Sequence, residues 1–582
     1  SAQSETFTFK VNDGTVDSSA ATISLDLRTD PLYQYQWHLN NTGQTNFATT
    51  GGTAGADLNV DTAIVSGITG SGVVVAVLDS GLELAHEDLV DNIVTGSYDF
   101  VNSDQDPTTS SNEGDHGTSV AGIIASKGWN NKGGRGVAPD ASLIGYNWLA
   151  ISPYASTGQK LKMWGSNPPV SANVDIYNMS LGVGYQLDDD EEQREDYDLP
   201  SFLRSSLEAG LINGTSNLRS GKGAVYIKSS GNNFEKYATS NCGTNLTCAE
   251  LFMDETNASP YITIIASLNA DNIKSSYSST GAGLWISGFG GENGGNQSVI
   301  GGQGYSLNNG IYKPAIMTTD QSTCASGYVS DAYVTKNTIY YNEFQNPSGH
   351  SENTNCNYHS TFNGTSSAAP TISGVIALML EANPDLTWRD VKHILATTAD
   401  KVDASRSHTY AGLNQHEWKT NDAGYEFHNW YGFGRVDAAE AVTTASAYTA
   451  NSLGTWVSTG YQSNGAINAT VDHTEYTLNT VNITKPSGSD DVVEFVRLSV
   501  QFNHAIPKSV GIRLLSPDNT VLHVMQPMTN INTNPLNTLF DIGVSGFYGE
   551  SIEGNWSIVL DDYTDDSTDG ILVRWGIEIW GH

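Results

Sequence analysis

Asn363-Gly-Thr-Ser-Ser-Ala-Ala-Pro370 places a serine, Ser366, at a glycine-containing turn directly before residues 371–380, which are small and apolar. Such a run favours a buried helix, so we expect Ser366 at the start of that helix. A hydroxyl held there can act as a nucleophile when a base reaches it. The letters Asn-Gly-Thr-Ser recur at 213–216, but an ordinary polar loop follows that copy.

Two further segments supply a carboxylate and a base. Residues 73–78 form a continuous apolar run that ends at Asp79, which is typical of a strand buried on both faces of a parallel sheet. Open α/β sheets place their sites at the carboxyl ends of such strands. His116 begins a second small-residue segment, and a neutral imidazole suits a general base near neutral pH.

Each of these residues alone has an ordinary explanation. A strand-end Asp79 before Ser-Gly is commonly a turn residue, His116 a surface histidine and Ser366 a helix cap. The order Asp, His, Ser in these three contexts favours a catalytic triad, whose members meet in space and not in sequence.

The chain resembles the subtilisin-like serine proteases in motifs that follow the family's order. These motifs are Val77-Leu-Asp79-Ser-Gly81, His116-Gly-Thr118, Asn178-Met-Ser-Leu-Gly182, Ser229-Ser-Gly-Asn232 and Gly364-Thr-Ser366-Ser-Ala-Ala-Pro370. The resemblance implies an α/β fold with a seven-stranded parallel sheet flanked by helices.

The resemblance also implies a role for each matching residue. Ser366 would be the nucleophile, His116 its base, and Asp79 the group that orients and stabilises the imidazole. Asn232 would donate its side-chain amide to the oxyanion. Ser180, Leu181 and Gly182 would form the strand that pairs with an extended substrate, although a plain buried strand is the alternative.

The carboxyl-terminal part has the pattern of an antiparallel β-sandwich or jelly roll. From about residue 478, short alternating runs such as 493–500, 512–515 and 556–560 are separated by turns, including Ser516-Pro-Asp-Asn519. Segments 554–556 and 569–581 resemble the P-domain of kexin-type and furin-like proprotein convertases. Segments 30–39 and 431–439 resemble the start and the close of that branch's catalytic domain.

Three regions follow from these patterns. We expect a catalytic domain at 29–448 and a P-domain at 449–582. Residues 1–28 resemble the end of an Ig-like or cadherin-like β-repeat, with a hairpin at 6–17 around Asp13-Gly14 and another strand at 20–27.

The kexin resemblance implies calcium, a hard cation that binds carboxylate, amide and carbonyl oxygens. Asp30 and Asp88 match family ligands, and the loop 127–134 would add an asparagine side chain and backbone carbonyls. Asn130 and Asn131 are hard to distinguish by alignment, and without the resemblance these residues would indicate only a solvated loop. The implied ligands are Asp30, Asp88, Lys127, Asn130, Lys132 and Gly134.

Substrate preference departs from the resemblance. Ser80 stands where dibasic-selective kexins have a second acid, and Leu181 replaces a tryptophan of their substrate strand, which argues against strict dibasic selection. Asp254 falls near a family S1 acid, and the acidic run 188–192 follows the substrate strand. An acid there would favour Arg or Lys at P1. If these acids only form a solvated face, a broad degradative protease with apolar P1 preference is the alternative.

Composition narrows the class of partner. The 582 residues include 63 Asp and Glu against 27 Lys and Arg, a net charge of −36. This charge argues against nucleic acid and anionic membranes and attracts cationic peptides. No apolar run reaches the roughly 18 residues of a spanning helix, so we expect no membrane insertion.

Cysteine positions are compatible with export. The four cysteines fall as two pairs by position, Cys242 with Cys248 and Cys324 with Cys356. Two disulfides suit a secreted protein, although three connectivities, or free thiols, stay open.

We therefore expect a secreted, bacterial, monomeric and calcium-dependent serine endopeptidase of the kexin-like subtilisin kind, acting on proteins and peptides. No propeptide of the kexin type is visible, so a dedicated chaperone or propeptide for folding is a hypothesis. The alternative from another class is a catalytically idle adhesion or scaffold protein that keeps a protease fold.

Overall fold

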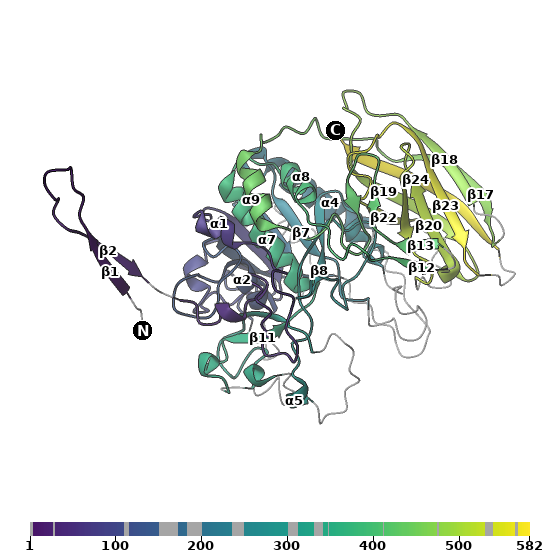
Figure 1. Ribbon diagram of the computed structural model, residues 1–582. Helices are drawn as coiled ribbons and strands as arrows, with labels where there is room; N and C mark the ends of the chain where they lie inside the picture. The colour runs from purple at the N-terminus through teal and green to yellow at the C-terminus, as the bar shows by residue number, and fades with distance from the viewer. Residues whose placement is uncertain are drawn as a thin grey trace.

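The computed structural model describes most of the chain in three parts. A hairpin at the amino end, a central α/β part and a carboxyl-terminal β part follow one another in Figure 1. The residues described are 4–26, 29–109, 116–149, 164, 173–182, 201–234, 250–300, 312–330, 342–346, 349–410, 413–473, 477–529, 539–564 and 569–582.

A parallel sheet of seven strands forms the centre of the α/β part, in the order β4-β5-β3-β6-β7-β8-β9. These strands are β3 (Val74–Asp79), β4 (Tyr98–Asp99), β5 (Ser142–Asn147), β6 (Ile176–Met179), β7 (Val225–Ser229), β8 (Ile262–Leu268) and β9 (Ile286–Phe289). Nearly every residue in them is buried, as in a sheet covered on both faces. The predicted seven-stranded parallel sheet is confirmed.

Helices cover the two faces of this sheet. Val75 and Val77 of β3 belong to the hydrophobic cluster on one face of the sheet, together with residues of a first set of helices. Ala76 and Leu78 belong to a second cluster, which also contains Leu211 of a different helix. This division follows from the alternation of side chains along a strand. The first set is α2 (His116–Ala125), α7 (Thr365–Ala382), α8 (Trp388–Thr397) and α9 (Ala438–Ala447), and the second cluster contains α4 (Ser201–Asn217).

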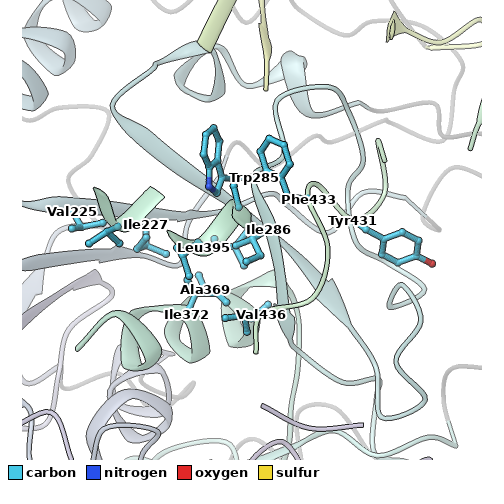
Figure 2. Close-up of a cluster of buried hydrophobic side chains, with 14 of the residues drawn as sticks. Val225, Ile227, Trp285, Ile286, Ala369, Ile372, Leu395, Tyr431, Phe433 and Val436 are labelled. Carbon is cyan, nitrogen blue, oxygen red and sulfur yellow. The ribbon is translucent and has the colours of Figure 1, made fainter. Parts of the chain in front are cut away.

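Helix α7 is the central helix of the first face. In Figure 2 its Ala369 and Ile372 lie beside Val225 and Ile227 of β7 and Ile286 of β9. All five are buried, and burying an Ile or Val side chain contributes about 1.5–3 kcal/mol. This packing fixes the axis of α7, and therefore the position of its amino-terminal turn.

The other α-helices and strands described between residues 29 and 448 are short. They are α1 (Asp61–Val65), α5 (Gln297–Ile300), β10 (Ile316–Thr319), β11 (Tyr358–Phe362), β12 (His408–Tyr410), β13 (Leu413–His416), β14 (Lys419–Thr420) and β15 (Glu426–Phe427). A disulfide joins Cys324 to Cys356 between β10 and β11. The predicted pair Cys242 and Cys248 lies outside the described residues.

Two antiparallel sheets form the carboxyl-terminal part. One contains β16 (Val457–Ser458), β17 (Gln462–Val471), β19 (Val493–Asn503), β22 (Phe540–Val544) and β24 (Gly570–Gly581), and the other contains β18 (Thr477–Ile483), β20 (Val510–Leu515), β21 (Val521–Met525) and β23 (Gly554–Asp562). Trp556 of β23 and Trp575 of β24, one from each sheet, are buried in the core of this β part. The all-β expectation is confirmed.

The domain limits themselves stay predictions. Helix α9 ends at Ala447 and β16 begins at Val457, so the proposed boundary at residue 448 falls between two elements. The β part also contacts the α/β part directly. The guanidinium Nε of Arg389 in α8 lies 3.1 Å from both carboxylate oxygens of Glu494 in β19, and both side chains are buried.

The amino-terminal hairpin differs from its prediction. Strand β1 (Ser4–Phe9) pairs antiparallel with β2 (Ala21–Asp26), so the second segment is the partner of the first and not an additional strand. The Asp13-Gly14 turn lies at the tip, where Gly14 has φ 95° and Asn12 bridges Asp17. The predicted pairing was wrong because an Asp-Gly turn indicates where the chain reverses direction but not which residues on either side pair as strands. The hairpin stands apart from the rest of the molecule in Figure 1.

Candidate active site

The predicted site residues lie where strands of the parallel sheet end and two helices begin. Asp79 is the last residue of β3, and the chain reaches Ser180 directly after β6 and Asn232 shortly after β7. His116 is the first residue of α2, and Ser366 lies in the first turn of α7. Because neighbouring parallel strands end at one edge of the sheet, these residues share that edge.

Asp79 and His116 form a close pair. The imidazole Nδ1 lies 2.8 Å from Asp79 Oδ1 and 2.9 Å from Oδ2. Since an ionised carboxylate only accepts, Nδ1 carries the proton and Nε2 is left to accept another one. Asp79 is fully buried, whereas the His116 side chain is 27% exposed, so the imidazole can be reached from solvent.

The start of α2 approaches β3 too closely for a side chain at residue 117. A Cβ placed on Gly117 would be 1.9 Å from the carbonyl oxygen of Gly81 and 2.9 Å from Cβ of Asp79. The glycine therefore allows His116 to sit against Asp79. The Asp79 carboxylate also accepts from the backbone N–H of Ser80, 2.7 Å from Oδ1.

Ser366 and Ser180 are joined by reciprocal contacts. The Ser366 hydroxyl donates to the carbonyl oxygen of Ser180 at 3.3 Å, and the Ser180 hydroxyl donates to the carbonyl oxygen of Ser366 at 2.9 Å. The amide nitrogen of Asn178 in turn donates to Ser180 Oγ at 3.0 Å. The predicted substrate strand is thus fastened beside the predicted nucleophile.

His116 also lies near the strand that leads into Ser366. Its imidazole centroid is 5.2 Å from the ring centroid of Phe362, the last residue of β11. The structure therefore joins His116 to Asp79 directly and places its ring beside Phe362, four residues before Ser366.

The side chain of Asn232 has a fixed orientation. Its Oδ1 accepts from the backbone N–H of Thr365 at 2.8 Å and from the Thr365 hydroxyl at 2.9 Å, so its amide N–H groups are turned elsewhere. Gly364 has φ 100°, and a Cβ on it would be 3.1 Å from Asn232 Nδ2. Glycine is needed here for its backbone conformation and for this approach. The Asn232 amide nitrogen consequently lies next to the turn that carries Ser366.

The predicted substrate strand continues from β6. Ser180 is buried, Leu181 is half-buried and Gly182 is exposed. The carbonyl oxygen of Leu181 accepts from the hydroxyl of Ser229 at 3.1 Å, which links the segments that follow β6 and β7. The predicted acidic run 188–192 lies outside the described residues.

Asp254 lies beneath Gly182 but is paired with a lysine. A Cβ on Gly182 would be 3.8 Å from Asp254 Oδ2 and 3.9 Å from Lys228 Nζ. The two charged groups are 2.8 Å apart and nearly fully buried. Burial opposes the charged form of Asp254, but the charge of Lys228 and hydrogen bonds from Lys228 and Thr256 keep its pKa below the usual value. Sequence reasoning missed Lys228, although a lysine after the apolar run 224–227 was a signal.

Among the predicted calcium ligands, Asp30 and Asp88 are buried and near each other. Asp88 Oδ2 has no hydrogen-bond partner, and a Cβ on Gly133 would be 2.4 Å from it. Burial, and to a smaller extent the charge of Asp30, raise the pKa of Asp88 to about 7. A buried carboxylate oxygen without a donor fits a hard cation. Arg135 was not foreseen, and its Nε donates to Asp30 Oδ2 at 2.8 Å.

The residues of loop 127–134, which were expected to offer oxygens to calcium, instead make hydrogen bonds within the protein. The Asn130 amide nitrogen donates to Asp88 Oδ1 at 2.6 Å, while its oxygen accepts from the backbone N–H of Lys132 at 2.8 Å. The Lys127 backbone N–H donates to the carbonyl oxygen of Asp88 at 2.8 Å. Gly134 packs against Gln36, whose Oε1 would be 2.5 Å from a Cβ on it. Asn130 and Lys127 therefore contact Asp88 directly, whereas Gly134 contacts Gln36.

Comparison with protein families matches this architecture. The subtilase family matches residues 70–434, and the proprotein convertase P-domain matches residues 493–579. The chain belongs to the subtilase family and is a serine endopeptidase of that family that also carries a convertase P-domain.

Two named relatives illustrate the range of similarity. The Aeromonas extracellular serine protease of Aeromonas sobria is 30% identical over 617 residues, which covers 95% of this chain and 91% of the relative. Kexin of Saccharomyces cerevisiae is 26% identical over 91% of this chain and 54% of its own length. The crystal structure of the Aeromonas sobria serine protease with the chaperone ORF2 has a TM-score of 0.81, with 30% identity and 95% of both chains covered.

Within the described residues, no helix has both the length and the apolar character needed to cross a lipid bilayer.

Proposed function

We propose that this endopeptidase cleaves peptide bonds through Ser366, His116 and Asp79 by way of an acyl-enzyme. The observation that supports it most is the Asp79–His116 pair, with Nδ1 and Oδ1 2.8 Å apart, while Ser366 lies in the first turn of α7. An idle scaffold would have no need for a buried carboxylate hydrogen-bonded to a partly exposed imidazole.

The proposed reaction uses these three side chains in two stages. Ser366 Oγ attacks the carbonyl carbon of the scissile bond while its proton passes to His116 Nε2. His116 then gives this proton to the leaving amine nitrogen, the C–N bond breaks and the acyl group stays on Oγ. Water, deprotonated by the same imidazole, attacks the ester carbonyl carbon. The imidazolium then returns this proton to Ser366 Oγ as the ester C–O bond breaks, which releases the acid and restores the serine. Asp79 holds the Nδ1–H and stabilises the imidazolium at each stage.

Asn232 would stabilise the charge that develops on the carbonyl oxygen. Its Oδ1 is engaged by Thr365, so an N–H of its amide is presented next to the Ser366 turn. Together with the backbone N–H of Ser366 it would form an oxyanion hole. An extended substrate would pair with Ser180, Leu181 and Gly182, which orients the scissile bond over Ser366.

Calcium would have a structural role. Bound Ca²⁺ compensates buried carboxylates and ties together the segments that supply them. Asp88 and Asp30 would hold it, with the loop around Asn130 and with backbone carbonyls of 127–134. In this chain, that would fasten the opening segment of the α/β part to the loop after α2.

Export and assisted folding belong to the same proposal. A relative carries the word extracellular in its name, and a similar structure is a complex with a chaperone. The Cys324–Cys356 disulfide is of the kind that persists in oxidising compartments. We propose secretion as a monomer with folding helped by a separate chaperone. Refolding of the isolated chain to full activity without any helper would contradict the chaperone.

Two kinds of P1 side chain, basic or neutral, have support from the structure. Asp254 beneath Gly182 favours Arg or Lys at P1, whereas its pairing with Lys228 favours neutral side chains. Digestion of a peptide library, read by mass spectrometry with the Ser366→Ala protein as the blank, tests the function. We expect endoproteolytic cuts with the wild type only. Equal digestion by both proteins, or none by either in the presence of Ca²⁺, would contradict the proposal.

A further inference from the structure

Lys228 is a buried cation at the carboxyl end of β7, two residues before Ser230 and beside the predicted substrate strand. Its Nζ donates to Asp254 Oδ2 at 2.8 Å and to Asn257 Oδ1 at 2.9 Å. The exposed fraction is 3% for the Lys228 side chain and 8% for that of Asp254. A lysine so buried is found almost only with a partner.

The ion pair lies at the place that a P1 side chain would reach. Lys228 is the register partner of Met179, so the segments that follow, 180–182 and 229–232, run side by side. The first would pair with the substrate backbone, and the second carries Asn232, which would hold the carbonyl oxygen. A P1 side chain attached between those two points enters the space between the segments, and the Gly182 Cβ position shows Asp254 and Lys228 directly below it.

The pair carries no net charge. A carboxylate alone in this position would attract a guanidinium or ammonium group strongly, because a buried site has a low effective dielectric constant. The Asp254 carboxylate is already paired with Lys228. A basic P1 side chain would have to displace Lys228 from Asp254 or be repelled by its positive charge. Removing one member of such a pair leaves an uncompensated buried charge, whose effect on a nearby ligand is large.

We propose that Lys228 is a specificity-determining residue: by neutralising Asp254 beneath Gly182, it removes the charge-based selection for Arg or Lys at P1. This inference rests on the proposed catalytic site. The P1 site then accepts neutral and apolar side chains at least as readily as basic ones, and the preference for basic side chains expected from Asp254 appears only when Lys228 is removed.

The test compares peptides that differ only at P1, with Arg, Lys, Leu or Phe, at about pH 8.5, where a buried carboxylate is more readily ionised. For the wild type we expect the Arg/Leu ratio of kcat/KM to be within about tenfold of one. Lys228→Met should raise this ratio by at least about tenfold, chiefly through a lower KM for the Arg peptide. Lys228→Arg keeps the cation and should leave the ratio unchanged.

A second pair of variants keeps the inference testable if Lys228→Met folds poorly. Lys228→Met with Asp254→Asn removes both charges, so its ratio should return to the wild-type value. Asp254→Asn alone leaves the cation and should lower the ratio. Active sites are counted in each preparation with a serine-directed phosphonate, so that only folded enzyme enters kcat.

The same measurements distinguish a wrong role for Lys228 from a wrong catalytic site. If the wild type cuts no peptide in a Ser366-dependent manner, the proposed function fails. If the wild type cuts but strongly prefers Arg at P1, or if Lys228→Met and the double variant share the wild-type ratio, the role of Lys228 is overturned and the catalytic proposal stands.

Discussion

The side-chain oxygen of Asn232 accepts two hydrogen bonds from Thr365, one from the backbone N–H at 2.8 Å and one from the hydroxyl at 2.9 Å. Thr365 immediately precedes Ser366, so the residue that orients the amide of Asn232 is part of the same turn as the proposed nucleophile. Thr365 therefore links the proposed oxyanion donor, Asn232, to the proposed nucleophile, Ser366.

Replacing Asn232 by Asp should lower kcat by about 10²–10³ with a smaller change in KM, because the donor acts on the transition state. The aspartate keeps an oxygen for Thr365, but it replaces the N–H donor by an acceptor and adds a negative charge. Steady-state kinetics with one peptide measures it, with Asn232→Ala as the second variant. A kcat within a few-fold of wild type in Asn232→Asp would remove this residue from the oxyanion hole.

Replacing Asp79 by Asn should lower kcat by about 10⁴, because an amide no longer selects the Nδ1–H tautomer of His116 or stabilises its cation. Ser80→Ala is a matched control, since the backbone N–H that binds Asp79 remains, and it should stay within about tenfold of wild type. Comparable kcat values for the two variants would contradict the role of Asp79.

Calcium should stabilise the fold through Asp88. In the Ser366→Ala background, which prevents autolysis, EDTA should lower the Tm and added Ca²⁺ should restore it, since an ion that binds only the folded state stabilises it by about 2.7 kcal/mol at a hundred times its Kd. Differential scanning fluorimetry measures the shift. Asp88→Asn should abolish the response, and the exposed Asp91→Asn should keep it. A melting curve that EDTA leaves unchanged removes the calcium proposal.

Glu250 should make stability depend on pH. Its buried carboxyl contacts Gln526 and Thr529 of the β part, and burial, which those two hydrogen bonds only partly offset, raises its pKa from 4.5 to about 8. Because the folded state holds this proton more tightly, the stabilisation is complete below about pH 4.5 and is lost as pH rises toward 8.

Glu250→Gln should therefore melt with a flatter pH profile than the wild type. The difference in free energy of unfolding between the wild type and Glu250→Gln should change by a few kcal/mol between about pH 5 and 8, because the wild type loses stability as pH rises. Thermal melts in the Ser366→Ala background measure it, and the exposed Glu553→Gln is the control. Parallel profiles for wild type and Glu250→Gln would show that this carboxyl does not titrate there.

Much of the fold follows from local sequence. The apolar run before Asp79 is the buried strand β3, and α2 and α7 begin at or just before His116 and Ser366 as their small-residue runs predict. Ser516-Pro-Asp-Asn519 is the turn between β20 and β21, with Asn519 at φ 70°. These features depend on residues close together in the chain.

The parts that sequence did not predict depend on partners distant in sequence. Nothing near Asp254 indicates that Lys228, on another strand, neutralises it, and nothing near Asp30 indicates Arg135. The contact of Arg389 with Glu494 joins two parts of the fold whose residues are far apart in the chain. Such pairs are decided by packing, which a pattern of single residues does not contain.

The most direct test of the catalytic account is to treat the wild type, loaded with Ca²⁺, with a fluorophosphonate and to map the adduct by peptide mass spectrometry alongside peptide hydrolysis. We predict one adduct, on the peptide that contains Ser366, with loss of hydrolysis in proportion to labelling and neither labelling nor hydrolysis in Ser366→Ala. Labelling on another serine, or hydrolysis that survives in Ser366→Ala, would contradict the assignment of the nucleophile.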